Sequence, residues 1–153
     1  VNIIGNGLYR FQAFMDEKKE WNLELHSGTK SFYNILHAGW NGPLRAASAG
    51  FGFGKPFSLS ESMSLALEIL GSRYFNGKQS MPRQHNLLVS FRLGLQTRML
   101  SFMTLVTGIS YNYFTSFNTP GIRMAPEAVH HYEFPWGNRN NIHWPGFYIG
   151  LRF

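Results

Sequence analysis

The chain contains no cysteine, which excludes disulfide bonds and metal sites built on thiolates. Charged residues are also scarce, at 14% of the sequence against roughly 25% in ordinary soluble domains. No apolar run approaches the ~20 residues that a membrane-spanning helix requires, so a helical membrane protein is excluded. The basic residues give a net charge of +6 but are scattered singly, which argues against nucleic-acid binding.

What the sequence does contain is aromatic residues, at 16%, and 16 glycines. Its 153 residues fit a single domain, which we take to span 1–153. This composition is typical of a transmembrane β-barrel, where apolar residues occupy alternate positions and never form a long run. No export signal opens the sequence, so for an exported protein we expect the signal to have been removed.

The residues from Ile142 to Phe153 have the clearest strand pattern, with a period of two. One face carries four apolar side chains: Phe147, Ile149, Leu151 and Phe153. The other face carries Tyr148, Gly150 and Arg152. This segment resembles the C-terminal strand of bacterial outer-membrane β-barrels, and the resemblance implies recognition by the barrel assembly machinery. The alternative is an edge strand of a soluble β-sandwich, because alternation occurs in all half-buried strands.

Similar alternation recurs along the chain and predicts about eight strands, with residues 31–40 fitting a helical turn as well as a strand. We therefore predict an all-β, antiparallel, up-and-down transmembrane barrel. Residues 16–20 form a solvent-exposed hairpin connection in this interpretation, residues 55–61 and 97–101 form turns, and 76–86 and 115–141 form long loops. The two longest connections fall on one side, as in small outer-membrane barrels, so both termini are predicted to be periplasmic.

The polar faces of the strands would meet inside the barrel, whose interior is just wide enough for side chains to fill. Small residues on one face of 44–54 would leave room for bulky neighbours. Buried charges must be paired, so we predict a structural network of carboxylates and guanidinium groups; a proton or ion path is the alternative. Its members are Arg10, Glu24, His26, Glu68, Arg92 and Arg152, with Gln12 and Gln96 beside them.

Several aromatic residues lie near the ends of the predicted strands, where belts at the two membrane interfaces would place them. They are Trp21, Trp40, Tyr74, Tyr113, Trp136 and Trp144.

The predicted architecture resembles the outer-membrane protein A and X type of small barrel, and the glycine- and aromatic-rich composition resembles barrels of the Bacteroidota. The resemblance implies a non-enzymatic protein of the Gram-negative outer membrane, without cofactor or bound metal. It would present surface loops or anchor an assembly, in contact with membrane lipid and other outer-membrane proteins. Four basic residues of the outer loops are candidates for lipopolysaccharide phosphates: Lys78, Arg83, Arg123 and Arg139.

The main alternative is a barrel hydrolase acting on lipid A or phospholipid. A Ser-His-acid site needs a hydroxyl next to an oriented histidine. The candidates are His130, His131 and His143, the acids Glu127 and Glu133, and the hydroxyls Ser110 and Ser116. The lipid A deacylase barrels carry a His-x-Ser-Asn motif that is absent here, and adjacent histidines of an extended chain point opposite ways, which disfavours a metal site. A soluble β-sandwich binding module is the third hypothesis, and the chain could also be part of a longer protein.

Overall fold

A computed structural model describes residues 8–42, 45–76, 86–117, 132–136 and 139–153, with only the backbone described for residues 8, 76, 117, 132–136, 139 and 140. Nine strands are found in these ranges: β1 (Leu8–Asp16), β2 (Glu20–Gly28), β3 (Tyr33–Asn41), β4 (Ala46–Ser58), β5 (Met63–Asn76), β6 (Asn86–Leu100), β7 (Met103–Phe117), β8 (Tyr132–Trp136) and β9 (Arg139–Arg152). None of the described residues forms a helix long and apolar enough to cross a membrane.

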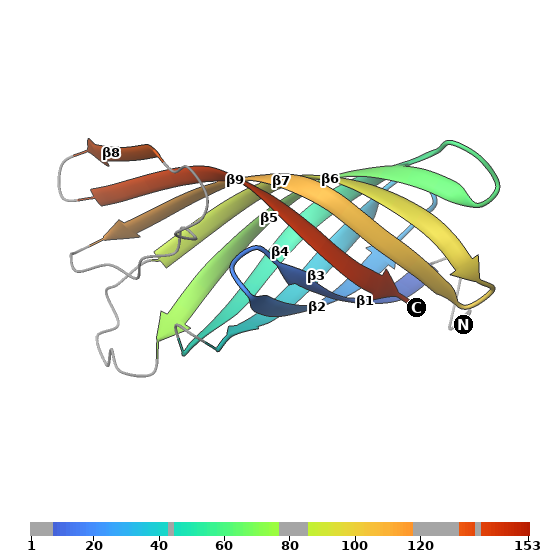
Figure 1. The fold of residues 1–153 in the computed structure, drawn as a ribbon, viewed down its shortest axis with the longest axis horizontal. Coiled ribbons are helices and arrows are strands. Elements are labelled where there is room, and N and C mark those ends of the chain that lie inside the picture. The colour runs from blue at the N-terminus through green and yellow to red at the C-terminus, as the bar shows by residue number, and fades with distance from the viewer. Residues whose placement is uncertain (1–7, 43–44, 77–85, 118–131, 137–138) are drawn as a thin grey trace.

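Strands β1 to β7 follow one another around the sheet, each antiparallel to the next, and β9 closes it by pairing with both β7 and β1. The result is an eight-stranded barrel with the short strand β8 added to one edge of β9 (Figure 1). The prediction of an antiparallel, up-and-down barrel of about eight strands is confirmed. Residues 31–40, which fitted a helical turn or a strand, lie mostly in β3.

The strands are staggered as well as paired. Following the pairings once around the barrel from Ser58 leads back to Ser48 of the same strand, a shift of ten residues. Such a stagger tilts the strands relative to the barrel axis, which is how a sheet of eight strands closes. A row of residues that pair with one another across neighbouring strands therefore runs obliquely around the barrel, advancing along the barrel axis from one strand to the next.

The two faces of the wall have opposite polarity. In β2, Trp21, Leu23 and Leu25 are exposed, whereas Glu20, Asn22, Glu24 and His26 are buried in the lumen. The same alternation continues through the other long strands, so most large apolar side chains of the described residues lie on the outside. This arrangement is the reverse of a soluble domain, where apolar side chains fill the core.

Glycines on the lumenal face make space for large neighbours, as the small-residue face of 44–54 predicted. A Cβ atom at Gly54 would lie 2.3 Å from the ring of Tyr33, and one at Gly94 would lie 2.4 Å from the hydroxyl of Tyr148. Both tyrosines are buried in the lumen. At these two positions the narrow interior has room for an aromatic ring because the facing strand carries no side chain.

Three predicted connections are wrong because the strands continue through them. Strand β4 runs through Pro56, which pairs with Ala66; beyond Gly54 the β4 edge toward β3 is unpaired, so a residue without N–H is tolerated there. Strand β6 continues to Leu100 and β7 begins at Met103, so most of the turn predicted at 97–101 belongs to β6. The segment 115–141 is not one loop, since it contains the end of β7, all of β8 and the start of β9.

Candidate functional site

The centre of the lumen is organised around the carboxylate of Glu24 on β2, which is fully buried. Arg92 Nη1 of β6 donates to its Oε1 at 2.6 Å, and His37 Nδ1 of β3 lies 3.2 Å from the same atom. His26 Nε2 lies 2.9 Å from Oε2. Three strands thus supply one cation and two imidazoles to one carboxylate, as a buried charge requires.

A second carboxylate, Glu68 of β5, lies toward the end of the barrel that holds the termini. The Tyr33 hydroxyl donates to its Oε1 at 2.5 Å, and Arg152 Nη2 lies 3.6 Å from that atom. Arg92 Nη1 is 3.8 Å from its Oε2, which joins the two carboxylates into one network. Arg152 also donates through Nε and Nη2 to Gln12 Oε1, at 2.9 and 2.6 Å.

The structure therefore brings together Glu24, His26, Glu68, Arg92 and Arg152, five of the six residues proposed for the network. Arg10 lies on the lumenal face of β1 but is only partly buried, and it forms no ion pair with any described residue. The sequence analysis missed His37 and Tyr33, which lie in the segment whose secondary structure was left open. Once β3 is a strand, its alternation places both residues inward.

The loop end of the lumen is closed by the turn between β1 and β2, and the prediction that 16–20 is solvent-exposed is wrong for most of it. The side chains of Glu17 and Lys18 are only 2% and 6% exposed, and Glu20 is fully buried. Lys18 contacts the Asp16 carboxylate. Burial lowers the pKa of Lys18, but the carboxylates of Asp16, Glu17 and Glu20 outweigh this effect and leave the pKa raised.

Glu17 fills a gap in the barrel seam. One edge of β9 pairs with β7 along its whole length. On the other edge, β1 pairs with residues 148–152 and β8 pairs with residues 139–143, so residues 144–147 have no strand partner on that edge. In this gap Phe147 N donates to Glu17 Oε2 at 3.2 Å, and Trp144 Nε1 donates to Glu17 Oε1 at 2.8 Å. Asn112 Nδ2 also donates to Oε1, at 3.1 Å. A Cβ atom at Gly146 would lie 2.5 Å from this oxygen, so the carboxylate enters where β9 has no side chain.

Further buried side chains pack in the described part of the lumen. An apolar cluster near the loop end contains Ala46, Tyr74, Leu88, Phe114, Ile142 and Trp144. Next to it, the Tyr74 hydroxyl and Ser48 Oγ each donate to the Glu20 carboxylate at 2.6 Å. The cavity between this cluster and Arg92 has a volume of only about 10 Å³, room for about one water molecule.

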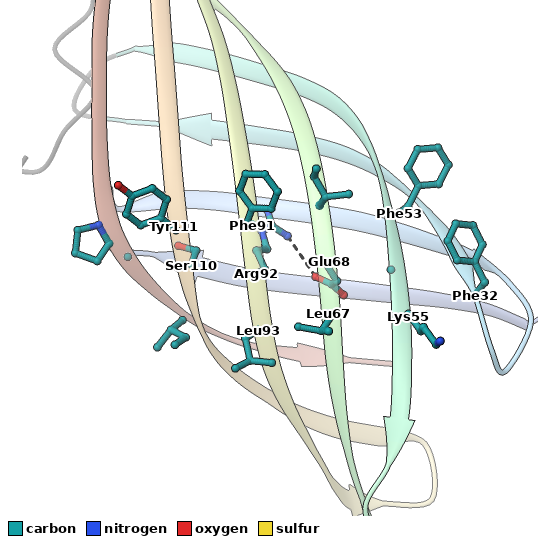
Figure 2. Close-up of a pocket in the computed structure, with 15 residues that line it drawn as sticks. Phe32, Phe53, Lys55, Leu67, Glu68, Phe91, Arg92, Leu93, Ser110 and Tyr111 are labelled. Carbon is teal, nitrogen blue, oxygen red and sulfur yellow. Dashed lines mark ion pairs between the residues drawn. The ribbon is translucent and has the colours of Figure 1, made fainter. Parts of the chain in front are cut away.

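A groove crosses the outer wall over strands β4, β5, β6, β7 and β9 and has a volume of about 810 Å³ (Figure 2). Two parallel ridges of outward side chains form its sides, and the register aligns the members of each ridge across the strands. The first ridge consists of Phe53, Ile69, Phe91, Tyr111 and Pro145. The second consists of Lys55, Leu67, Leu93, Ile109 and Phe147, of which the first four line the groove.

The floor of the groove is the row of residues that lies between the two ridges. The side chains of this row face the lumen. The row starts at Gly54 and ends at Gly146. Phe32, from the turn before β3, stacks on Phe53 at a ring separation of 5.7 Å and closes one end. The charge pair of Glu68 and Arg92 lies beneath this floor, on the other side of the wall (Figure 2).

The proposed membrane-insertion strand coincides with the C-terminal half of β9. Phe147, Ile149 and Phe153 are exposed on the outer wall, Leu151 is partly exposed on the same face, and Arg152 is buried in the lumen. The lipopolysaccharide candidates lie elsewhere: Lys78, Arg83 and Arg123 are outside the described residues, and of Arg139 only the backbone, at the start of β9, is described.

The interfacial aromatic prediction divides into two groups. Trp21 and Trp40 are exposed cross-strand partners on the outer wall, and Tyr113 is also exposed. Tyr74 and Trp144 are buried in the lumen, so for these two the prediction is wrong. Continuing the alternation from Leu70 to Tyr74, and from Tyr148 back to Trp144, would have placed both inward. Trp136 ends β8, for which only the backbone is described.

The residues considered for a hydrolase do not come together where the structure describes them. Ser110 and Ser116 face the lumen, whereas His143 lies on the outer wall and contacts the Tyr111 hydroxyl. His130, His131 and Glu127 are outside the described residues, and only the backbone of Glu133 is described. Among the described residues, no group of three or more histidine and acidic side chains is placed to hold a metal ion.

A closed antiparallel barrel with an apolar outer wall and a polar, charge-paired lumen is the architecture of a transmembrane β-barrel. The structure thus identifies the class of protein as a transmembrane β-barrel.

Comparison with known proteins adds little to this. No family model matches the chain, and no curated protein matches it. A solved chain described as "De novo design of transmembrane beta-barrels" matches with a TM-score of 0.45 and 9% sequence identity, over 97% of this chain and 98% of that chain.

Proposed function

We propose that this protein is a non-enzymatic integral barrel of the Gram-negative outer membrane, which presents surface loops or anchors an outer-membrane assembly. The observation that carries the proposal is the opposite polarity of the two wall faces. Fifteen-residue strands such as β6 and β7 expose leucine, isoleucine and aromatic side chains outward while Arg92 is sealed inside. A barrel with charges buried in its lumen and an apolar outer face is stable in a bilayer, because the outer face contacts lipid instead of water.

The orientation follows from the lengths of the connections. The segment between β5 and β6 (77–85) and the segment between β7 and β9 (118–138, which includes β8) connect strand ends at one end of the barrel, as do the turn after β1 and the connection from β3 to β4. The other end has the turns 29–32, 59–62 and 101–102 and both termini (Figure 1). Small barrels have long extracellular loops and short periplasmic turns. In this proposal the termini are periplasmic and the long connections face the outside.

A filled lumen supports a role at the surface over a role in transport. Three groups of side chains follow one another along the barrel from its loop end: the turn at Glu17 and Lys18, the apolar cluster, and the Glu24–Arg92 pair. The cavity between the apolar cluster and Arg92 has a volume of only about 10 Å³. The proposal therefore gives the charge network a structural role, and it requires no cofactor.

The proposed partners follow from the location. The barrel assembly machinery would recognise β9 during insertion, membrane lipid would cover the outer wall, and other outer-membrane proteins would bind the loops or the wall. Lipopolysaccharide phosphates would bind Lys78, Arg83, Arg123 and Arg139, since guanidinium and ammonium groups form charge-assisted hydrogen bonds with phosphate. Changing these four residues to Ala is expected to weaken lipopolysaccharide binding, and unchanged affinity would contradict this contact.

The membrane proposal is tested by extracting the protein in detergent and comparing unheated and heated samples on a denaturing gel. A barrel that resists detergent until it is heated will migrate differently in the two samples and show strand-type circular dichroism when unheated. A protein that is soluble in plain buffer and shows no shift would contradict the proposal and favour a soluble β-sandwich.

A further inference from the structure

The groove on the outer wall is apolar and carries a single cation, Lys55, near the end that Phe32 closes. Each ridge crosses five strands, so its length is four strand spacings of about 4.8 Å, roughly 19 Å in all. Of the residues that line it with outward side chains, only Lys55 is charged. A long, apolar groove with one positive end is complementary to an amphiphile that has a flexible hydrocarbon chain and an anionic head.

Lys55 is free to serve such a head group. Its side chain is exposed, and it forms no ion pair with any described residue. The ammonium group lies 5.3 Å from the ring centre of Phe57, which is a weak cation–π contact. A lysine on a lipid-facing wall extends its charged end toward the membrane interface, where phosphate groups lie.

The groove also runs in the direction that a lipid requires. Lys55 lies three residues before the end of β4, at the end of the barrel that holds the termini. Because of the ten-residue stagger, the row that starts at Lys55 climbs toward the loop end as it crosses from β4 to β9. At the far end of the groove the outward side chains of the two ridges, Ile109, Tyr111 and Pro145, are uncharged. A molecule with its head at Lys55 would therefore extend its chain into the hydrocarbon interior.

We propose that this groove is a specific binding site for one glycerophospholipid of the leaflet on the termini side, with the phosphate at Lys55 and an acyl chain between the two ridges. This inference rests on the proposed membrane location. It goes beyond general lipid contact, because it predicts one molecule that stays bound when the surrounding bilayer is replaced by detergent.

The experiment is native mass spectrometry of the barrel in a mild detergent, with added phosphatidylglycerol or with diacylglycerol carrying the same acyl chains. We expect one phosphatidylglycerol to be retained per barrel and diacylglycerol to be lost. Lys55→Gln should weaken retention about fivefold, since one lysine near a lipid phosphate contributes about that factor. Leu93→Trp, which fills the groove without touching the charge, should also release the lipid.

Two matched controls separate the site from general effects. Lys30→Gln removes an exposed cation from the turn between β2 and β3, and Leu25→Trp enlarges an exposed side chain of β2 outside the groove. Both should retain lipid like the unaltered protein. Equal retention of the two lipids, or equal retention by Lys55→Gln and Lys30→Gln, would overturn the inference, as would a mass that shows a second copy or another protein on the wall.

The same preparation distinguishes this failure from failure of the proposed function. A heat-dependent gel shift in every variant shows that the barrel is folded in detergent, so loss of lipid binding then concerns the groove alone. Absence of the shift in the unaltered protein contradicts the membrane location itself.

Discussion

The carboxylate of Glu17, in the first turn, accepts a 2.8 Å hydrogen bond from the indole of Trp144, 127 residues later in the chain. This contact fixes the turn between β1 and β2 inside the barrel and covers residues 144–147 of β9 on the edge where neither β1 nor β8 pairs with them. The barrel is therefore closed partly by strand pairing and partly by one acidic side chain.

Glu17→Ala is expected to destabilise the barrel by about 2–3 kcal/mol, because it leaves buried donors of Trp144 and Asn112 without an acceptor. The measurement is denaturant unfolding in detergent micelles. Glu61→Ala, in the exposed turn between β4 and β5, is the control and should change stability by less than about 0.5 kcal/mol. Equal effects of the two changes would show that the Glu17 contacts are not needed.

The pair of Glu24 and Arg92 should behave as a unit. Either Glu24→Gln or Arg92→Met leaves a charge in the lumen without its nearest partner, 2.6 Å away, and should cost about 3–5 kcal/mol. The double variant leaves neither charge, so its loss should be smaller than the sum of the single losses. A double-mutant cycle on unfolding free energies measures this coupling, and strict additivity would contradict a shared role.

Gly150→Ala should impair closure between β1 and β9. A Cβ atom there would lie 2.3 Å from the Ala13 carbonyl oxygen and 2.3 Å from Phe14 Cβ, so backbone must move, at a cost of about 1–3 kcal/mol. Gly42→Ala is the matched control, because no atom lies within 4 Å of its added Cβ. The yield of heat-modifiable barrel after refolding is the readout, and equal yields would contradict the close approach.

Alkaline pH should weaken the loop end through Lys18, whose pKa is raised in the folded protein by Asp16, Glu17 and Glu20 despite burial. A raised folded pKa gives stability that is fully present below the ordinary value of 10.5 and is lost as pH rises through the folded value. Unfolding free energies of the unaltered protein should therefore fall above pH 10.5 more steeply than those of Lys18→Gln. Parallel curves would show that Lys18 does not titrate as expected.

The sequence predicted the barrel because alternation is a local property, visible within any six or seven residues of one strand. The inward placement of Glu24, Glu68 and Arg92 depended only on this period. The positions of Glu17 and Lys18 could not be found in this way, since they depend on where the short strand β1 stops along the edge of β9. A run of five charged residues is normally solvated, and only the uncovered β9 edge reverses that expectation.

The groove could not be predicted from the alternation within single strands either. Its ridges join residues from five strands, and which side chains align depends on a register that no single strand encodes. Lys55 illustrates the difference, because the sequence analysis placed it in a turn at residues 55–61. The continuation of β4 past the end of β3 moves this lysine onto the outer wall.

The wall of the barrel is uneven in height, and this has a consequence for the membrane around it. Strands β1, β2 and β3 have nine residues each, which only just spans the hydrocarbon at the usual tilt, whereas β5, β6, β7 and β9 have 14 or 15. In the proposed membrane location, lipid beside these short strands would thin or the whole barrel would tilt, as expected from hydrophobic mismatch. The protein would then deform its bilayer on one flank only, and neighbouring proteins would meet a membrane of different thickness on its two sides.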